Sequence, residues 1–302
     1  MATLITGAAG HLGSQVIEFL YQWDGPSNLV ATSRDASNAT RFEPKEIRFL
    51  VADFSKLETL HAAFKEVAKL LIISTMDYDT DRRAQLQNNA IDAAVAAKVG
   101  HVYFTSAAWG GSDETSQAHI QQANLKTEAY LKRSNLSYWT NGRSGLKYTI
   151  IREGIYADHF GLFLNYNANS AEVVLPGDGQ IAWATRRDLA EGTARVIQAP
   201  SVDYAGKTVL LTGSRTTSLT EVTKLIAEIT SKELPVRFIS PDDYIAQAIS
   251  AGQSEWVART RLSHYTAVQA GELAIISPTL EQLLGRKPTQ VDEAVREAVL
   301  HK

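Results

Sequence analysis

The sequence contains no cysteine among its 302 residues. This absence excludes disulfide bonds, thiolate metal sites and cysteine nucleophiles. It also means that cysteine content does not indicate whether the protein resides in an oxidising or a reducing compartment. An excess of one charge is also lacking, because the formal net charge is -3 and the lysines and arginines are scattered. Nucleic acid binding requires a clustered basic surface. We therefore expect small-molecule partners and no nucleic acid partner.

Long apolar runs are missing as well. The first residues lack the basic and apolar regions of a signal peptide, and no later run approaches the length of a membrane span. Hydrophobic residues make up 44% and charged residues 21% of the chain, which is typical of a globular protein. The composition predicts a cytoplasmic protein with no membrane partner and with one large core or two unequal cores.

Up to residue 153, short strand-like runs alternate with longer segments of helical periodicity, which indicates βαβ units and a parallel sheet. The predicted strands are 2–6, 28–32, 47–51, 70–74, 101–105 and 147–152. Two predicted helices place apolar residues on one face, namely Leu12, Val16, Ile17 and Leu20 in the first and Leu57, Leu60, Phe64 and Val67 in the second. Each stripe is expected to pack on the sheet.

The alternation loosens after residue 153. We predict strands at 172–175, 209–212 and 236–239, a helix at 219–230 and mainly helical structure over the last sixty residues. Residues 135–146 interrupt the earlier rhythm after a helix ending near Ser134, and they predict an inserted loop or hairpin that carries Tyr138 and Trp139. An aromatic lid over a planar substrate, a packed surface loop and a subunit contact of a homodimer are the alternatives.

A glycine-rich turn follows the first predicted strand. Its sequence Gly-Ala-Ala-Gly-His-Leu-Gly spans residues 7–13 and leads into a helix that begins near His11 or Leu12. Such a turn lets a pyrophosphate approach backbone N–H groups at a positive helix end. We predict a cofactor site at Gly7, Gly10, His11, Leu12 and Gly13, although the same turn can connect a strand and a helix without a ligand. The expected fold is an α/β Rossmann fold, a doubly wound parallel sheet with a smaller mixed α/β second domain.

The end of the second predicted strand distinguishes the cofactors. An acidic residue there would hold the ribose 2′-OH of NAD, whereas the chain has Ser33 and Arg34. A hydroxyl and a guanidinium suit a 2′-phosphate, which favours NADPH/NADP+. Asp35 is the competing residue for NAD, or else a turn or cap residue.

Other polar residues follow the later strands. Asp53 and Phe54 could bracket an adenine, and Asp53 could equally cap the next helix. The pairs Ser74–Thr75 and Thr105–Ser106 follow the fourth and fifth strands, where open α/β sheets bind their ligands. We expect these two pairs to line the nicotinamide half of the cofactor site.

Several segments resemble one known family. They are residues 4–13, 69–74, 148–152 with Gly154 and Tyr156, 179–188 and 206–213. The chain resembles the NmrA-like, atypical short-chain dehydrogenases, and within them the NADPH-dependent type-2 quinone oxidoreductases. The resemblance implies a Rossmann domain (1–153 and about 181–213), a smaller substrate domain (about 154–180 and 214–302) and NADPH in the cleft between them. Some relatives act as NADP redox sensors or transcriptional co-regulators.

The candidate catalytic residues depart from the short-chain dehydrogenase pattern. No Tyr-x-x-x-Lys pentad is present, and where relatives carry a lysine or histidine our register places Asn124, with Lys126 two residues later. Asn124 could orient a carboxamide or a substrate oxygen, and Lys126 could contact ribose or supply a proton. Lys126 and Glu128 should not share a helix face. Both candidates could equally be solvated helix residues.

Tyr156 and His159 follow the sixth predicted strand and begin the presumed substrate domain. His159 could act as an acid near neutral pH, while packing or structural hydrogen bonds are the alternatives for both residues. We expect Asp188 to be structural. The sequence has no Gly-x-Ser-x-Gly elbow and no His-Glu-x-x-His motif, and we expect no metal site.

These observations favour an NADPH-dependent reductase of a small planar electrophile, such as a quinone, an enone or an imine. A water or a side chain would supply the proton. Two alternatives remain: a non-catalytic NADP(H) sensor whose output is a protein contact, and a net redox-neutral isomerase or cyclase that retains the cofactor.

Overall fold

The computed structural model describes residues 2–77, 79–139 and 146–300. Within these residues the largest sheet has seven strands in the order β3-β2-β1-β4-β5-β6-β9. They are β1 (Ala2–Ile5), β2 (Leu29–Ser33), β3 (Arg48–Val51), β4 (Val67–Ile72), β5 (His101–Ala107), β6 (Lys147–Glu153) and β9 (Lys207–Leu211). From β3 across to β5, each neighbouring pair runs parallel. This arrangement confirms the doubly wound sheet, whose order reverses between β1 and β4.

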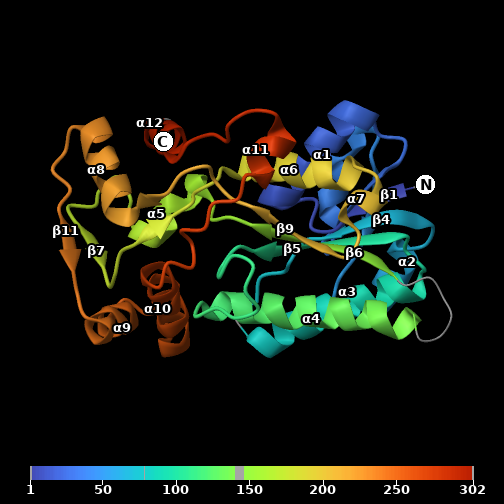
Figure 1. Ribbon diagram of the computed structural model, residues 1–302, viewed down its shortest axis with the longest axis horizontal. Coiled ribbons are helices and arrows are strands. Elements are labelled where there is room, and N and C mark those ends of the chain that lie inside the picture. Colours follow the sequence, from blue (N-terminus) through green and yellow to red (C-terminus); the bar gives the residue numbers. More distant parts are fainter. Residues whose placement is uncertain (1, 78, 140–145, 301–302) are drawn as a thin grey trace. The chain divides into compact units, whose positions relative to one another are not determined.

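Helices cover both faces of this sheet. They are α1 (His11–Asp24), α2 (Leu57–Ala63), α3 (Thr80–Ala96), α4 (His119–Trp139), α6 (Arg186–Gln198) and α7 (Ser201–Tyr204), with 3-10 turns η1 (Ala36–Arg41) and η2 (Glu43–Lys45). Figure 1 shows α3 and α4 on one face and α1 with α6 on the other. A cation–π contact between Arg195 and Trp23, at 5.0 Å, joins α6 to α1.

The predicted core stripes are confirmed for α1 and only partly for α2. All four predicted apolar residues of α1 are buried. In α2, Leu57 is 46% exposed, and Val67 lies in β4 rather than in the helix. Val67 falls outside the helix because α2 ends at Ala63 and the chain then turns at Glu66, whose φ of 61° is in the left-handed region.

A second set of elements forms its own core. The helices are η3 (Ala157–His159), α5 (Phe160–Leu164), α8 (Leu219–Thr230), α9 (Pro241–Ser250), α10 (Glu255–Gln269), α11 (Thr279–Leu284) and α12 (Val291–Leu300). The strands are β7 (Val173–Leu175), β8 (Gln180–Ile181), β10 (Thr217–Ser218) and β11 (Val236–Phe238), paired as β7 with β11 and β8 with β10. The predicted helix 219–230 and the helical carboxyl-terminal region are confirmed.

The chain divides into two compact units. Unit 1 comprises Met1–Ser106, Ala123–Arg152 and Ala190–Val209, and unit 2 comprises Ala107–Gln122, Glu153–Leu189 and Leu210–Lys302. Segments 107–122, 181–189 and 210–213, together with Glu153, were expected in the first domain and belong to unit 2. Backbone hydrogen bonds account for the difference, since the N–H of Ala108 donates to Glu153 O and that of Ala184 donates to Ile155 O.

The region predicted as an insertion begins with a helix. Helix α4 continues to Trp139, so the predicted helix end near Ser134 and the loop over 135–139 are wrong. Residues 140–145 and the side chains of Tyr138 and Trp139 lie outside the described part of the structure. The turn-forming residues at 135–137 are accommodated within a helix of 21 residues, where their local preferences do not decide the conformation.

His101 is a buried structural histidine at the start of β5. Its ring stacks on Tyr103 at 4.1 Å, and its Nε2 lies 2.8 Å from Thr149 Oγ1. The Thr149 hydroxyl donates to Tyr204 O, so it accepts from a protonated Nε2 of His101. Burial, with the charges of Lys69 and Lys147 nearby, lowers the pKa of His101 to about 4.

We expect the free energy of unfolding to fall between pH 6.5 and pH 4. An unfolded histidine binds a proton near pH 6.5, whereas folded His101 does so only near pH 4. The stability from neutral His101 is therefore fully present above the unfolded pKa and is lost as pH falls through the folded one, by up to about 3 kcal/mol. Urea unfolding from pH 4.5 to 7.5 measures this.

The His101→Gln variant should show a flatter pH profile than the wild type. Part of the slope should remain, because burial also lowers the pKa of His264 to about 4. The matched control is His61→Gln at an exposed position of α2, which should parallel the wild type. Equal slopes for His101→Gln and the wild type would contradict the prediction.

Candidate functional site

The glycine turn between β1 and α1 has a backbone that side chains would disrupt. Gly7 has φ of 59°, and the N–H of Gly10 donates to Gly7 O at 2.9 Å. A Cβ on Gly13 would lie 2.3 Å from Gly7 O and 2.9 Å from the Cα of Ala8. Position 13 therefore requires glycine, because α1 crosses the turn too closely for any side chain.

The amino terminus of α1 is left open by this turn. Gly10 is its N-cap and has no side chain that could cap the helix, and the first turn contains no acidic residue. Exposed His11 and buried Leu12 contribute the first helical N–H groups. Uncapped N–H groups at the positive end of a helix bind anions. The turn thus fits the pyrophosphate of a dinucleotide.

The end of β2 and the residue that follows it combine a structural hydroxyl with an exposed guanidinium group. Ser33 Oγ accepts from the N–H of Asp35 and from Asn38 Nδ2, while Arg34 is exposed. The Asp35 carboxylate accepts from the N–H of Ser37 at 2.9 Å, which makes it the N-cap of η1. Asp35 thus has a capping role, the alternative that the sequence left open.

Arg41 is a neighbour of the glycine turn that the sequence did not indicate. It ends η1, and its Nη1 donates to Ala9 O at 2.6 Å. No spacing rule connects residue 41 to residue 9, since the contact depends on how η1 folds back after β2. The structure therefore adds a second guanidinium, beside the turn itself.

Asp53 and Phe54 follow β3 in a tight turn. The Asp53 carboxylate accepts from the N–H and the hydroxyl of Ser55, at 2.9 and 2.7 Å. Partial burial raises the pKa of Asp53, but the Ser55 hydrogen bonds and the charges of Lys56 and Arg34 outweigh it and bring the pKa below its usual value. Phe54 packs partly against the core of unit 1. The structure thus brings Arg34 near Asp53 and gives Asp53 a turn-stabilising role.

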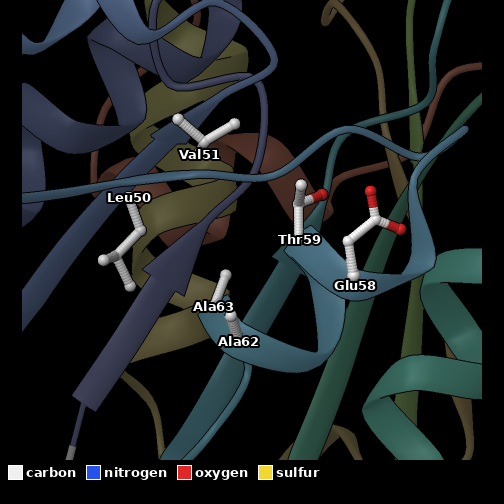
Figure 2. Close-up of a pocket in the computed structure, with 6 residues that line it drawn as sticks. All are labelled: Leu50, Val51, Glu58, Thr59, Ala62 and Ala63. Carbon is white, nitrogen blue, oxygen red and sulfur yellow. The ribbon is translucent and has the colours of Figure 1, made fainter.

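A pocket of about 350 Å³ adjoins this turn. It lies between β3 and α2 and is lined by Leu50, Val51, Glu58, Thr59, Ala62 and Ala63. Figure 2 shows Glu58 and Thr59 side by side, on the side away from Leu50. The Thr59 hydroxyl accepts from the N–H of Asp53 at 2.9 Å and so links the pocket to the turn. The remaining lining residues are apolar.

The segment after β4 is held by side-chain acceptors from other elements. The N–H of Ser74 donates to Thr105 Oγ1 at 3.0 Å, and that of Thr75 donates to Gln87 Oε1 at 3.2 Å. Thr105 and Ser106 are buried, whereas Ser74 and Thr75 are partly exposed. The structure therefore brings the two predicted pairs together through the Thr105 hydroxyl, which positions the backbone at Ser74.

Asn124 and Lys126 point in different directions from α4. Asn124 is 1% exposed, and its Oδ1 accepts from Nη2 of buried Arg83 at 3.1 Å. Lys126 has a side chain that is 53% exposed and forms an ion pair with Asp81. Burial lowers the pKa of Arg83 to about 10, so its guanidinium is charged at neutral pH. Sequence reasoning did not find Arg83 as the partner of Asn124.

Glu128 lies on the buried side of α4 and Lys126 on the exposed side, in agreement with the prediction that the two residues do not share a helix face. Its carboxylate accepts from Nε and Nη2 of Arg152 in β6, at 3.0 and 2.7 Å. Both side chains are almost fully buried, at 2% and 1% exposed. Asn124 and Glu128 are four residues apart and therefore share a helix face.

Tyr156 and His159 lie in unit 2, close to a buried carboxylate. The Tyr156 hydroxyl donates to Glu153 Oε2 at 3.1 Å, and the Arg186 guanidinium lies 5.3 Å from the Tyr156 ring centre. Burial, followed by the charge of Glu153, raises the pKa of Tyr156 well above its usual value. Exposed His159 meets the Tyr156 ring edge-on, at 6.1 Å. Tyr156 is thus a hydrogen-bond donor.

Asp188 is structural, as expected. Its carboxylate is 1% exposed and accepts from Arg286 Nη2 at 2.8 Å and from the N–H of Thr289 at 2.6 Å. It therefore anchors the segment between α11 and α12. Over the described ranges, no group of three or more histidine, aspartate or glutamate side chains could hold a metal ion. None of the helices in the described part of the chain has the length and apolar character of a membrane span.

Comparisons with known proteins agree with this geometry. A family model described as NAD(P)H-binding matches residues 7–200. An NmrA-like family domain-containing oxidoreductase of Aspergillus flavus is 33% identical over 305 residues, covering 99% of this chain and 95% of the relative. Quinone oxidoreductase 2 of Escherichia coli is 30% identical over 298 residues, covering 96% of each chain.

Solved structures show the same similarity over the whole chain. The NADPH complex of the E. coli quinone oxidoreductase has a TM-score of 0.86 at 29% identity and covers 99% of this chain and 100% of that one. The NADP(H) complex of Citrobacter sp. triphenylmethane reductase has a TM-score of 0.84 at 26% identity, with coverage of 98% and 100%. The chain therefore belongs to the NAD(P)H-binding family, among the NmrA-like oxidoreductases.

Proposed function

We propose that this protein is an NADPH-dependent reductase of a small planar electrophile, such as a quinone, an enone or an imine. The observation that carries the proposal is the open amino terminus of α1 behind the glycine turn, with Arg41 beside it and Arg34 on the adjoining segment. Backbone N–H groups suit a pyrophosphate, and guanidinium groups suit a 2′-phosphate. The relatives named for quinone and triphenylmethane reduction support a flat, conjugated substrate.

The chemistry needs few protein groups. A bound nicotinamide supplies the hydride, and the protein orients the reactants and directs one proton to the reduced substrate. Overall, NADPH, a proton and a quinone give NADP+ and a hydroquinone. We propose that Asn124 orients a carbonyl oxygen through its amide, since Arg83 holds its Oδ1.

Water, Lys126, Tyr156 and His159 are the candidate proton sources. Lys126 carries exchangeable protons and is exposed, although it is paired with Asp81. Tyr156 stays protonated because its pKa is raised, so it can donate a hydrogen bond but cannot serve as a base at neutral pH. His159 is exposed and can exchange protons with solvent.

We expect NADPH oxidation in the presence of at least one planar electrophile. Loss of NADPH absorbance would be followed across benzoquinones, naphthoquinones, enones, cyclic imines and triphenylmethane dyes. NADPH binding without turnover of any compound would contradict the proposal and favour a non-catalytic redox sensor. The absence of a Tyr-x-x-x-Lys pentad and the pairing of Lys126 with Asp81 favour this second function. A protein partner retained with only one cofactor redox state would support it.

Replacing Arg34 or Arg41 should weaken the binding of NADPH more than that of NADH. We expect Arg34→Ala and Arg41→Ala each to raise the KM for NADPH about tenfold, because each removes a charge-assisted hydrogen bond to the 2′-phosphate. The KM for NADH should stay within about twofold, since NADH lacks that phosphate. The control is Arg48→Ala, at the exposed amino end of β3. Equal losses for NADH and NADPH would contradict a 2′-phosphate role.

Changing Asn124 to aspartate tests its amide. A carboxylate has the same shape and can pair with Arg83, but it has no N–H group to donate. We expect the Asn124→Asp variant to keep its Tm while kcat falls at least about tenfold, the cost of losing one positioned donor. Steady-state kinetics and thermal unfolding measure both. Unchanged kcat would show that the Asn124 amide plays no part in turnover.

A further inference from the structure

The segment after β4 has all three of its leading N–H groups bound to side chains. The N–H of Ile73 donates to Thr6 Oγ1 at 2.9 Å, and those of Ser74 and Thr75 donate to Thr105 and Gln87. A backbone leaving a sheet loses its strand partners, and its polar groups must find others. Here the acceptors come from β1's carboxyl end, β5 and α3. The position of this segment is therefore set by three separate elements.

Gln87 differs from the two threonines because it has a second partner on α4. It is 0% exposed, and its Nε2 donates to Thr127 Oγ1 at 2.7 Å. The Thr127 hydroxyl in turn donates to Ala123 O at 2.9 Å. Because the Thr127 proton is committed to Ala123, this hydroxyl can only accept from Gln87, which fixes the orientation of the Gln87 amide.

These bonds form one directed chain across unit 1. It runs from the N–H of Thr75 through both ends of the Gln87 amide and the Thr127 hydroxyl to Ala123 O. The carbonyl of Ala123 belongs to the peptide that precedes Asn124. Linked hydrogen bonds polarise and strengthen one another in a buried environment. One side chain thus connects the predicted cofactor-lining segment to the helical turn that carries Asn124.

We propose that Gln87 is a positioning residue that couples the cofactor-lining segment Ile73–Thr75 to α4 at Asn124. This inference rests on the proposed reductase function. Gln87 sets the segment through Oε1 and sets the turn of α4 through Nε2 and Thr127. Loss of the bond at Oε1 should therefore affect cofactor binding, and loss of the bond at Nε2 should affect turnover.

Two variants separate these ends. Gln87→Met keeps the length of the side chain and removes both hydrogen bonds, so we expect the Kd for NADPH to rise about threefold to tenfold and kcat to fall about tenfold, as for small misplacements of reacting groups. Thr127→Val keeps the shape and removes the hydroxyl that bonds to Gln87 and to Ala123 O, while the bond from Thr75 to Gln87 stays. We expect it to lower kcat by a similar factor and to leave the Kd for NADPH within about twofold.

The matched control is Gln85→Met on the same helix. Gln85 is exposed and bonds only to Asn89 among the described contacts, so Kd and kcat should stay at wild-type values. NADPH fluorescence titration gives Kd without turnover, steady-state assays give kcat, and thermal unfolding gives Tm. Should the wild type reduce no compound, the reductase proposal fails, while the Kd of Gln87→Met still tests the bond to Thr75.

The outcomes discriminate between positioning and simple support of the fold. A Thr127→Val variant with lowered kcat and unchanged Kd supports the coupling, and it does so even where Gln87→Met does not fold. Unchanged Kd and kcat in folded Gln87→Met would overturn the proposal. The proposal would also be overturned if Tm fell in both variants and the two variants changed Kd and kcat in the same proportion.

Discussion

The buried ion pair between Arg152 and Glu128 fixes the helix on which the candidate chemistry depends. Two hydrogen bonds join the side chains, and both are withdrawn from water. Removing two charges from water costs several kcal/mol per ion, and removing one partner of such a pair costs about 3–5 kcal/mol. Only one rotation of α4 about its axis satisfies this pair. That rotation also faces Asn124 toward Arg83 and Lys126 toward solvent.

The polar contacts around α4 form a layer within unit 1 rather than a set of isolated bonds. Arg83 and Gln87 lie four residues apart on α3 and meet Asn124 and Thr127 on α4. Each buried polar group is costly unless it is paired. Such a layer therefore specifies one arrangement of the two helices, where apolar side chains alone would tolerate sliding and repacking. A reaction that needs few catalytic groups depends on this fixed geometry to orient its reactants.

The parts that the sequence predicted well are those governed by local rules. The strands, the start of α1 and the helix 219–230 follow from apolar periodicity and glycine placement. Gly13 was recognisable because its turn is built from seven consecutive residues. Arg41, Arg83 and Gln87 were not, because each contacts residues more than thirty positions away. The helical 135–139 segment was missed because turn-forming residues at the end of a long helix carry misleading local preferences.

The same difference separates the cofactor site from the site of the reaction. A pyrophosphate is bound by backbone N–H groups, so its site is encoded by glycines at fixed spacing and by the helix that follows. The proton and the substrate are handled by side chains whose positions depend on long-range packing, and those positions can change while the fold persists. Families with one cofactor site can thus contain both reductases and regulators. This chain lacks the Tyr-x-x-x-Lys pentad, and on α4 Asn124 is held by a guanidinium and Lys126 by a carboxylate. Proton delivery is therefore the step in which this protein should differ most from dehydrogenases that carry the pentad.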